Sequence, residues 1–197
     1  MDCTQPEFWE ERYRAGRMPW DFQGVPPVLG EYLRHTAPTG TVLVPGCGSG
    51  YEAKAFHDHG WRPQAVDFSP AAVERARGLL GPLSSLVREA DFFSGELGGP
   101  YDLIYERTFL CSLPPARWPD YAHRCARVLR PGGRIAGFFY YGVDPDGPPF
   151  PLTPTVAAQI FEHFELKVDR ALPATESLPL YAGFERWQEW ELRQDGV

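Results

Sequence analysis

Residues 41–67 read TVLVPGCGSGYEAKAFHDHGWRPQAVD, and this stretch decides the fold. Residues 41–44 form a short apolar, β-branched run, which predicts a buried strand. Three glycines follow within residues 46–50, and an apolar pattern with helical spacing begins at Tyr51. Residues 65–67 then predict the end of a second strand. The stretch is therefore expected to fold as strand, tight turn, helix and strand.

An acidic residue, Asp67, stands where the second strand should end, and it follows the turn that contains Gly48. A carboxylate there can accept hydrogen bonds from both hydroxyls of a ribose. The glycine spacing is G-x-G-x-G, and Tyr51 stands where the third glycine of a dinucleotide site would make room for a pyrophosphate. The turn therefore favours a nucleoside without phosphates, such as S-adenosylmethionine, over NAD. A turn that merely joins a strand to a helix is the alternative.

The composition limits the class of protein. The chain has 197 residues, enough for one well-buried α/β domain, and we expect residues 1–197 to form a single domain. The formal charge of −7 argues against a nucleic-acid-binding protein. No apolar run approaches the roughly 20 residues of a membrane span, and the N-terminal residues lack the apolar core of a signal peptide. We therefore expect a cytoplasmic protein without a membrane segment. The four cysteines lack metal-ligand spacing, so we expect no metal site.

The remaining chain continues the alternation of helices and strands. Apolar residues recur at helical spacing over residues 71–80 and 119–129, and proline or glycine breaks flank these runs. Strands are predicted over residues 84–88, 101–105, 134–140, 164–169 and 184–192. Strands that alternate with helices form parallel sheets, whereas the last two strands, joined by a loop, indicate an antiparallel partner at one edge.

Two further pairs of residues follow predicted strands. Asp91 and Phe92 can bind an adenine amine and lie on the base, although a solvated loop explains the same residues. Glu106 and Arg107 follow residues 101–105, at a strand end of the kind where ligands collect in open α/β sheets. Arg107 can attract an anionic acceptor, or it can form a salt bridge with Glu106 or a surface acid.

Several motifs resemble the class I S-adenosylmethionine-dependent methyltransferases of the thiopurine methyltransferase type, which include plant thiol and halide methyltransferases. The motifs are FWEERYRAGRMPWD, VLVPGCGSGYEAKAF, VDFSPAAVERA, DFF, YDLIYERTFLCSLPP, VLRPGG and GPPF, and they cover most of residues 8–150. The resemblance implies a Rossmann-like, doubly wound α/β fold. Its seven-stranded sheet would be mostly parallel with an antiparallel last strand, and helices would cover both faces.

The resemblance also implies a helical lid over the cofactor, formed by residues 5–33. Three aromatic residues, Trp9, Tyr13 and Trp20, would close over the ligand, and Tyr13 stands where the family usually has tryptophan. From spacing alone, the same aromatics would be expected to cover the sheet.

The expected cofactor contacts come from the turns after the strands. By resemblance, Gly46 meets the methionine portion of S-adenosylmethionine, Asp67 the ribose, and Asp91 with Phe92 the adenine. The other residues expected at the cofactor are Gly48, Phe68 and Arg107.

The expected reaction is direct methyl transfer to a small molecule, by a protein that is a monomer or a simple homodimer. The sulfonium makes the methyl group electrophilic, so the protein has to hold a nucleophile in line and exclude water, with no metal required. We expect a thiol, hydrosulfide or halide as acceptor, with Arg107 as the catalytic residue. The residues expected to wall the acceptor pocket are Trp20, Phe109, Tyr140 and Tyr141. An O- or N-methyltransferase of a small aromatic metabolite and a catalytically silent S-adenosylmethionine-binding protein are the alternatives.

Overall fold

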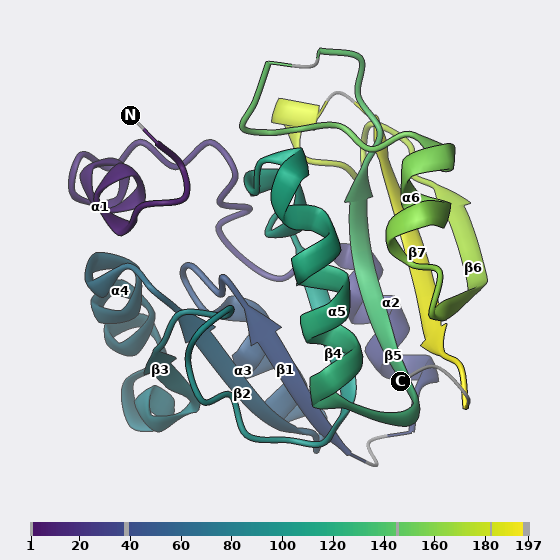
Figure 1. Ribbon diagram of the computed structural model, residues 1–197. Helices are drawn as coiled ribbons and strands as arrows, with labels where there is room; N and C mark the ends of the chain where they lie inside the picture. Colours follow the sequence, from purple (N-terminus) through teal and green to yellow (C-terminus); the bar gives the residue numbers. More distant parts are fainter. Residues whose placement is uncertain (1, 38–39, 145, 182, 195–197) are drawn as a thin grey trace. The chain divides into compact units, whose positions relative to one another are not determined.

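The computed structural model describes residues 2–37, 40–144, 146–181 and 183–194. The chain divides into two compact units, Met1–Leu97 and Gly98–Val197, each with its own strands and helices (Figure 1).

The strands of the first unit are parallel and lie in the order β3-β2-β1. They are β1 (Thr41–Pro45), β2 (Arg62–Asp67) and β3 (Val87–Glu89). The third strand begins later than the expected residue 84, because Gly81–Leu86 forms a 3₁₀ helix, η1. Gly81 has a φ of 55°, a left-handed conformation that ends the preceding helix and starts this turn.

Four helices belong to the first unit: α1 (Pro6–Arg14), α2 (Pro27–His35), α3 (Tyr51–Asp58) and α4 (Pro70–Leu80). Three of them begin at proline, which suits the first turn because its missing N–H has no partner there. The Ser69 side chain accepts a hydrogen bond from the Ala72 amide at 3.3 Å and so caps the N-terminus of α4.

The strands of the second unit lie in the order β4-β5-β7-β6. They are β4 (Tyr101–Arg107), β5 (Leu129–Tyr140), β6 (Phe164–Ala171) and β7 (Glu185–Leu192). The β4–β5 pair is parallel, whereas β7 runs antiparallel to both β5 and β6. The described residues thus contain seven strands, and the last in sequence is antiparallel, as expected.

Two α-helices belong to the second unit: α5 (Trp118–Val128) and α6 (Pro154–Ile160). Short 3₁₀ helices lie at Leu110–Ser112 (η2), Pro115–Arg117 (η3) and Pro179–Tyr181 (η4). The β5 strand starts at the end of α5, five residues before the expected position 134. Gly133 makes this possible, because a Cβ there would stand 3.1 Å from the Tyr101 carbonyl oxygen of the neighbouring strand.

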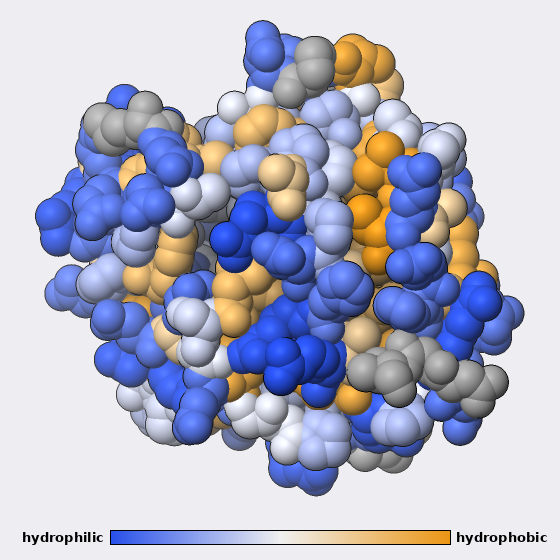
Figure 2. Space-filling model, viewed as in Figure 1, coloured by the Kyte–Doolittle hydropathy of each residue, from blue (hydrophilic) through white to orange (hydrophobic). Residues whose placement is uncertain are grey.

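Each unit buries large apolar and aromatic side chains around its strands. Phe56, Leu29 and Leu43 are fully buried in the first unit, and Tyr105 and Phe139 in the second. Hydrophilic residues cover much of the face in Figure 2, with apolar residues in patches between them. Among the described residues, the helices are too short or too polar to cross a membrane.

Candidate functional site

The turn between β1 and α3 carries three glycines in the left-handed region of φ. Their φ values are 56° at Gly46, 51° at Gly48 and 75° at Gly50. The Gly50 amide donates to the Cys47 carbonyl oxygen at 2.9 Å, which closes the turn immediately before α3. Residues with a side chain adopt this conformation at a cost, so the glycines explain why the chain can turn this tightly here.

Two of these glycines serve different purposes. A Cβ on Gly50 would stand 2.9 Å from Leu80 and 3.2 Å from Ala76, so this glycine lets the turn pack against α4. A Cβ on Gly48 would instead meet the Tyr13 hydroxyl at 2.8 Å. In a dinucleotide site the third glycine allows close helix packing. Here that role has moved one residue earlier, to Gly50, and Tyr51 begins the helix.

Asp67 ends β2 beside this turn, as its spacing from Gly48 predicts. The Gly48 amide donates to Oδ2 at 3.1 Å, and the Ser69 amide donates to Oδ1 at 2.9 Å. The side chain is 6% exposed. Burial raises the pKa of Asp67 to about 6, although the backbone hydrogen bonds oppose the shift. The carboxylate is therefore mostly ionised at neutral pH.

The arrangement at Asp67 fits a ribose. A carboxylate has about four acceptor positions, and the Gly48 and Ser69 amides take one on each oxygen. The Phe68 amide is a further backbone donor to this carboxylate, and the remaining acceptor capacity is available to a ribose. The left-handed Gly48, which has no side chain, allows the rest of a nucleoside with an amino-acid tail to pass close to the backbone. The residues present thus fit S-adenosylmethionine.

The aromatic segment, by which we mean residues 6–22, brings its three predicted aromatics together. The Trp9 and Trp20 rings meet edge to face at 5.3 Å, and the Tyr13 and Trp20 rings at 6.0 Å. The Trp9 indole N–H also donates to the Cys3 carbonyl oxygen at 2.8 Å. The three side chains form one cluster within the first unit.

The Tyr13 hydroxyl lies on the glycine turn. It is the group that a Cβ on Gly48 would meet first. Burial, followed by the negative charge of Asp67, raises the pKa of Tyr13 above its ordinary value of 10. A ligand laid over Gly48 and Asp67 would therefore contact the Tyr13 side chain directly.

Asp91 has its carboxylate in a local turn. Its Oδ1 accepts from the Phe93 amide at 2.9 Å, and its Oδ2 accepts from the Ser94 hydroxyl at 2.6 Å. Phe92 is 3% exposed, and its ring packs edge to face on Phe93 at 5.3 Å. Because the Phe92 ring is in the core, a base placed here would meet the backbone of this turn as well as the half-buried Phe93. Phe68, directly after Asp67, is also half-buried.

Arg107 ends β4 in the second unit, and its guanidinium is buried against an acid. Its Nη1 lies 2.7 Å from Glu185 Oε1, with the two side chains 8% and 2% exposed. The guanidinium also lies 4.1 Å from the centre of the Phe138 ring. The ion-pair partner at this distance is thus a buried acid on β7. The sequence suggested Glu106 or a surface acid instead. Burial raises the pKa of Glu106, and the charge of Arg107 does act on that carboxyl, because it lowers the pKa against the effect of burial. The charge of Arg107 is compensated within the second unit.

Glu185 also holds a segment of backbone. Its Oε2 accepts from the Ser177 hydroxyl at 2.7 Å and from the Leu178 amide at 2.8 Å. This segment leads to η4 and to Tyr181, whose hydroxyl lies 3.5 Å from the Cys111 sulfur. The pair of Arg107 and Glu185 therefore connects the end of β4 to the position of Tyr181.

Glu106 is a second buried acid, and its sequence neighbours do not reveal its role. Its Oε1 accepts from the Phe109 and Leu110 amides at 2.9 and 2.8 Å, and its Oε2 accepts from the Tyr121 hydroxyl at 2.7 Å. Burial raises the pKa of Glu106 to about 7 against the effect of these hydrogen bonds. Thr108 lies inside the loop that they close and has a φ of 59°, unusual for a residue with a side chain. Glu106 thus fixes the loop that follows β4.

The residues expected to line an acceptor pocket contact different side chains and belong to different units. Tyr140 packs on Tyr181, with ring centres 4.8 Å apart. The next residue, Tyr141, donates from its hydroxyl to Gln188 Oε1 at 3.2 Å. Phe109 lies 6.0 Å from the Tyr121 ring. These three belong to the second unit, whereas Trp20 belongs to the first.

The sequence matches a known protein family. A family model described as thiopurine S-methyltransferase (TPMT) matches residues 4–192. The chain belongs to the thiopurine S-methyltransferase family. This confirms the resemblance that the motifs indicate.

Two relatives illustrate the range of this thiopurine S-methyltransferase family. The chain is 35% identical over 149 residues to "Probable thiol methyltransferase 2" of Arabidopsis thaliana, a match that covers 72% of this chain and 66% of that protein. The chain thus spans just under two thirds of the length of this plant relative. It is 28% identical over 217 residues to the thiopurine S-methyltransferase of Pseudomonas fluorescens (strain SBW25), which covers 98% of this chain and 94% of that one.

A solved structure shares the fold of this family member. The 1,6-didemethyltoxoflavin-N1-methyltransferase of Burkholderia thailandensis was crystallised with 1,6-didemethyltoxoflavin and S-adenosylhomocysteine. It matches with a TM-score of 0.76 at 19% identity, over 95% of this chain and 87% of that chain. The likeness, together with the strand set described above, confirms the Rossmann-like, doubly wound α/β fold.

Proposed function

We propose that the chain transfers a methyl group from S-adenosylmethionine to a small sulfur nucleophile, such as a thiol or hydrosulfide. The assignment of S-adenosylmethionine as the cofactor depends on the 3.1 Å hydrogen bond from the Gly48 amide to Asp67 Oδ2. It places a carboxylate with spare acceptor capacity beside Gly48, which has no side chain. The assignment of a sulfur compound as the acceptor is supported by family membership and by the names of the thiol and thiopurine methyltransferases among the relatives.

The residues of the first unit would hold the cofactor. Asp67 accepts the ribose hydroxyls, and the left-handed turn at Gly46 and Gly48 passes the methionine portion. The aromatic segment lies over both and excludes water. The residues proposed to contact the cofactor are Trp9, Tyr13, Trp20, Gly46, Gly48, Asp67, Phe68, Asp91 and Phe92. When bound, the cofactor supplies an electrophilic methyl group on its sulfonium, and the chain needs no nucleophile of its own.

The residues of the second unit would position the acceptor. We place Arg107 on this side, acting through its ion pair with Glu185 at 2.7 Å. Because that pair compensates the guanidinium charge, Arg107 would hold the Ser177–Tyr181 segment and not attract an anion by net charge. Phe109, Tyr140 and Tyr141 are the proposed wall residues, each fixed by a contact within the unit. A soft sulfur anion suits this arrangement, because it reacts without a general base once its own pKa lies near the working pH.

The test is an acceptor panel with methyl-labelled S-adenosylmethionine. The panel contains a small thiol, hydrosulfide, thiocyanate, iodide, a phenol and an aromatic amine, and label transfer to each is measured at pH 7.5. Transfer to the sulfur compounds is expected. The Asp67→Asn variant serves as the matched control, because it should lose transfer to every acceptor through weaker cofactor binding. Label found only on phenol or amine would refute the sulfur assignment, and no calorimetric binding of S-adenosylmethionine would refute the cofactor assignment.

A further inference from the structure

We propose that Glu10 and Asp21 are positioning residues for cofactor binding. They fasten the aromatic segment to Ser69, whose amide donates to Asp67, and to Ser49, which follows Gly48, the other backbone donor to Asp67. The inference rests on the proposed function, because it assumes that Asp67 holds the cofactor. All of the residues involved lie within the first unit.

The first fastening joins α1 to the start of α4. Glu10 Oε2 accepts from the Ser69 hydroxyl at 2.7 Å and from the Ala71 amide at 2.9 Å. The Ser69 amide donates to Asp67 Oδ1 at 2.9 Å. Ser69 therefore donates hydrogen bonds to two carboxylates: its hydroxyl donates to Glu10 and its backbone amide donates to Asp67. A carboxylate is also favoured at this place by the dipole of α4, which has its positive end here.

The second fastening joins the end of the aromatic segment to the glycine turn. Asp21 Oδ2 accepts from the Ser49 hydroxyl at 2.7 Å and from Arg75 Nη2 at 3.3 Å. Arg75 Nε in turn donates to Ser49 Oγ at 2.8 Å, so the three side chains form a closed set. Ser49 directly follows Gly48, the other backbone donor to Asp67. The Asp21 side chain is 8% exposed, so this ion pair is shielded at one end.

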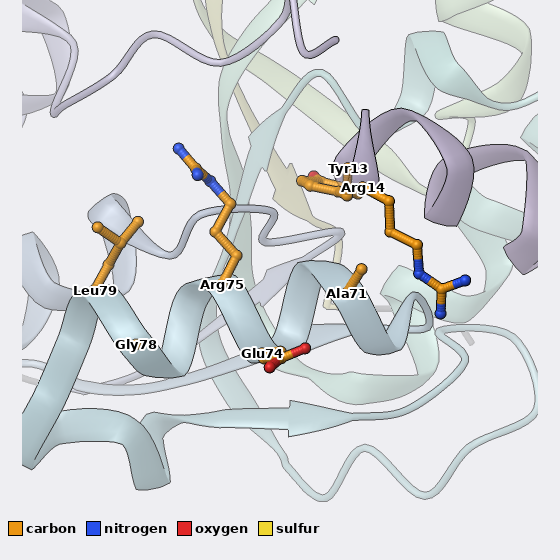
Figure 3. A pocket seen from close by; sticks show the side chains of 7 residues that line it. All are labelled: Tyr13, Arg14, Ala71, Glu74, Arg75, Gly78 and Leu79. Carbon is orange, nitrogen blue, oxygen red and sulfur yellow. The ribbon is translucent and has the colours of Figure 1, made fainter. Parts of the chain in front are cut away.

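The packing between the aromatic segment and α4 is incomplete, so apolar burial does not hold this segment alone. A solvent-open hollow of about 450 Å³ lies between the end of α1 and α4. Tyr13 and Arg14 on α1 and Arg75 on α4 are among the residues that line it (Figure 3). Phe8 is the buried residue of α1 among those described. The polar fastenings at Glu10 and Asp21 therefore add to the apolar contacts that hold the aromatic segment.

The position of the two fastenings in the aromatic segment indicates that they would slow the release of a bound cofactor. Glu10 and Asp21 bracket Tyr13 in sequence, and the Tyr13 hydroxyl lies on Gly48. Holding the segment at both ends would keep the Tyr13 side chain at this place. A bound cofactor would be covered by the same aromatics. Loss of one fastening would loosen that end of the aromatic segment, which eases the exit of the ligand and leaves the turn itself unchanged, and loss of the other would add to this effect independently. The expected effect is faster release of the cofactor, with little change in its association rate.

The experiment compares Glu10→Gln, Asp21→Asn and Arg75→Met with a matched control, Glu11→Gln. Glu11 is the neighbouring acid on α1 and pairs at 3.0 Å with the exposed Arg17, outside both fastenings. Calorimetry and stopped-flow tryptophan fluorescence give the dissociation constant and the release rate of S-adenosylhomocysteine. We expect roughly tenfold weaker binding in each of the three variants, mainly through the release rate. Glu11→Gln should match the wild type, and all melting temperatures should stay close to that of the wild type.

The pairwise combinations test the two fastenings separately. Asp21→Asn and Arg75→Met act on one fastening, so their combined effect should be no larger than either alone. Glu10→Gln and Asp21→Asn act on different fastenings, so their effects should multiply. Unchanged release rates in Glu10→Gln and Asp21→Asn would overturn the inference, as would an equal effect of Glu11→Gln.

Hydrogen exchange in the cofactor-free protein separates this inference from the proposed function. Glu10→Gln should speed exchange of the backbone amides in residues 6–22, whereas Glu11→Gln should not. Equal exchange in the two variants would show that Glu10 does not fasten the segment, whether or not the cofactor binds. A wild type that fails to bind S-adenosylhomocysteine would overturn the proposed function, and with it the cofactor role of these two acids.

Discussion

The Gly48 amide lies 3.1 Å from Asp67 Oδ2. Asp67, the last residue of β2, is thus hydrogen-bonded to the turn that follows β1. The bond explains how a buried acid can remain charged beside a tight turn. It also predicts what happens when the charge is removed.

Asp67→Asn should weaken S-adenosylmethionine binding by about 1 to 3 kcal/mol, because charge-assisted hydrogen bonds to the ribose are lost. Calorimetry measures this, with Asp58→Asn as control, since Asp58 forms an exposed pair with Lys54. The pKa of Asp67 is raised to about 6. In the wild type, affinity should therefore be constant above pH 7 and fall as the pH drops through 6. Asp67→Asn should be flat over that range, and an equal pH dependence would argue against the ribose role.

Arg107→Met should lower the free energy of unfolding by about 3 to 5 kcal/mol, because it leaves Glu185 charged and without its ion-pair partner in the core. Glu185→Gln, introduced on top of Arg107→Met, should recover part of this loss, since the amide can still accept from Ser177 and Leu178. Urea denaturation followed by circular dichroism gives the three values. An Arg107→Met variant as stable as the wild type would mean that the 2.7 Å pair does not hold the second unit together.

Glu106 should make stability depend on pH. Burial raises its pKa from the ordinary 4.5 to about 7, so between these values the folded chain keeps a proton that the unfolded chain has lost. The free energy of unfolding should therefore decrease as pH rises from 4.5 to 7, by roughly 3 kcal/mol from this group, and level off above 7.

Glu106→Gln isolates that contribution, because glutamine carries no proton to lose. Its oxygen can accept from the Phe109 and Leu110 amides, and its NH₂ can donate to the Tyr121 oxygen. We expect the variant to equal or exceed the wild type in stability at pH 8. The difference between the two should grow from pH 5 to pH 7, and parallel curves from chemical denaturation would contradict the pKa shift.

Gly137→Ala should prevent folding of the second unit. Gly137 has a φ of 153°, and a Cβ there would stand 1.9 Å from the carbonyl oxygen of Glu106, its partner on β4. The clash is with backbone, which cannot move without breaking the strand pair. Gly78→Ala in α4 is the control, since nothing lies within 4 Å of its Cβ and alanine should stabilise the helix by about 0.5 to 1 kcal/mol. Circular dichroism and the yield of soluble protein measure both.

The elements that could be predicted from the sequence have local signals. Ser69-Pro70 and Thr153-Pro154 begin α4 and α6, and such a start can be read from the sequence because a cap and a proline act within one turn. The glycines and Asp67 lie together as expected, since a strand that ends beside a turn fixes both. The residues that make up each of these signals are at most 19 positions apart in the sequence.

The start of β5 and the buried polar residues of β7 show what a local pattern misses. The proline and glycines of residues 130–133 were expected only to end the helix before them. In the structure these residues also belong to the first part of β5. In β7, buried Glu185 and Gln188 interrupt the apolar alternation because each has polar partners inside the unit. A pattern of apolar residues cannot identify acids and amides that are buried with their partners.

The long-range bonds of the candidate site could not be predicted either. Glu10 binds Ser69 across 59 positions, and Arg107 binds Glu185 across 78. In the sequence, Glu10 is one of several acids on a surface-like helix, and Arg107 stands beside Glu106, which is bonded elsewhere. Only the fold decides which acid each of them meets.

The burial of Arg107 against Glu185 bears on efforts to redesign the protein. A directed-evolution library that varies position 107 alone would start most of its members with a folding defect. Selection for new acceptors would then report expression level more than catalytic preference. Libraries that randomise positions 107 and 185 together, with Ser177 kept, would sample chemistries at this strand end without that bias.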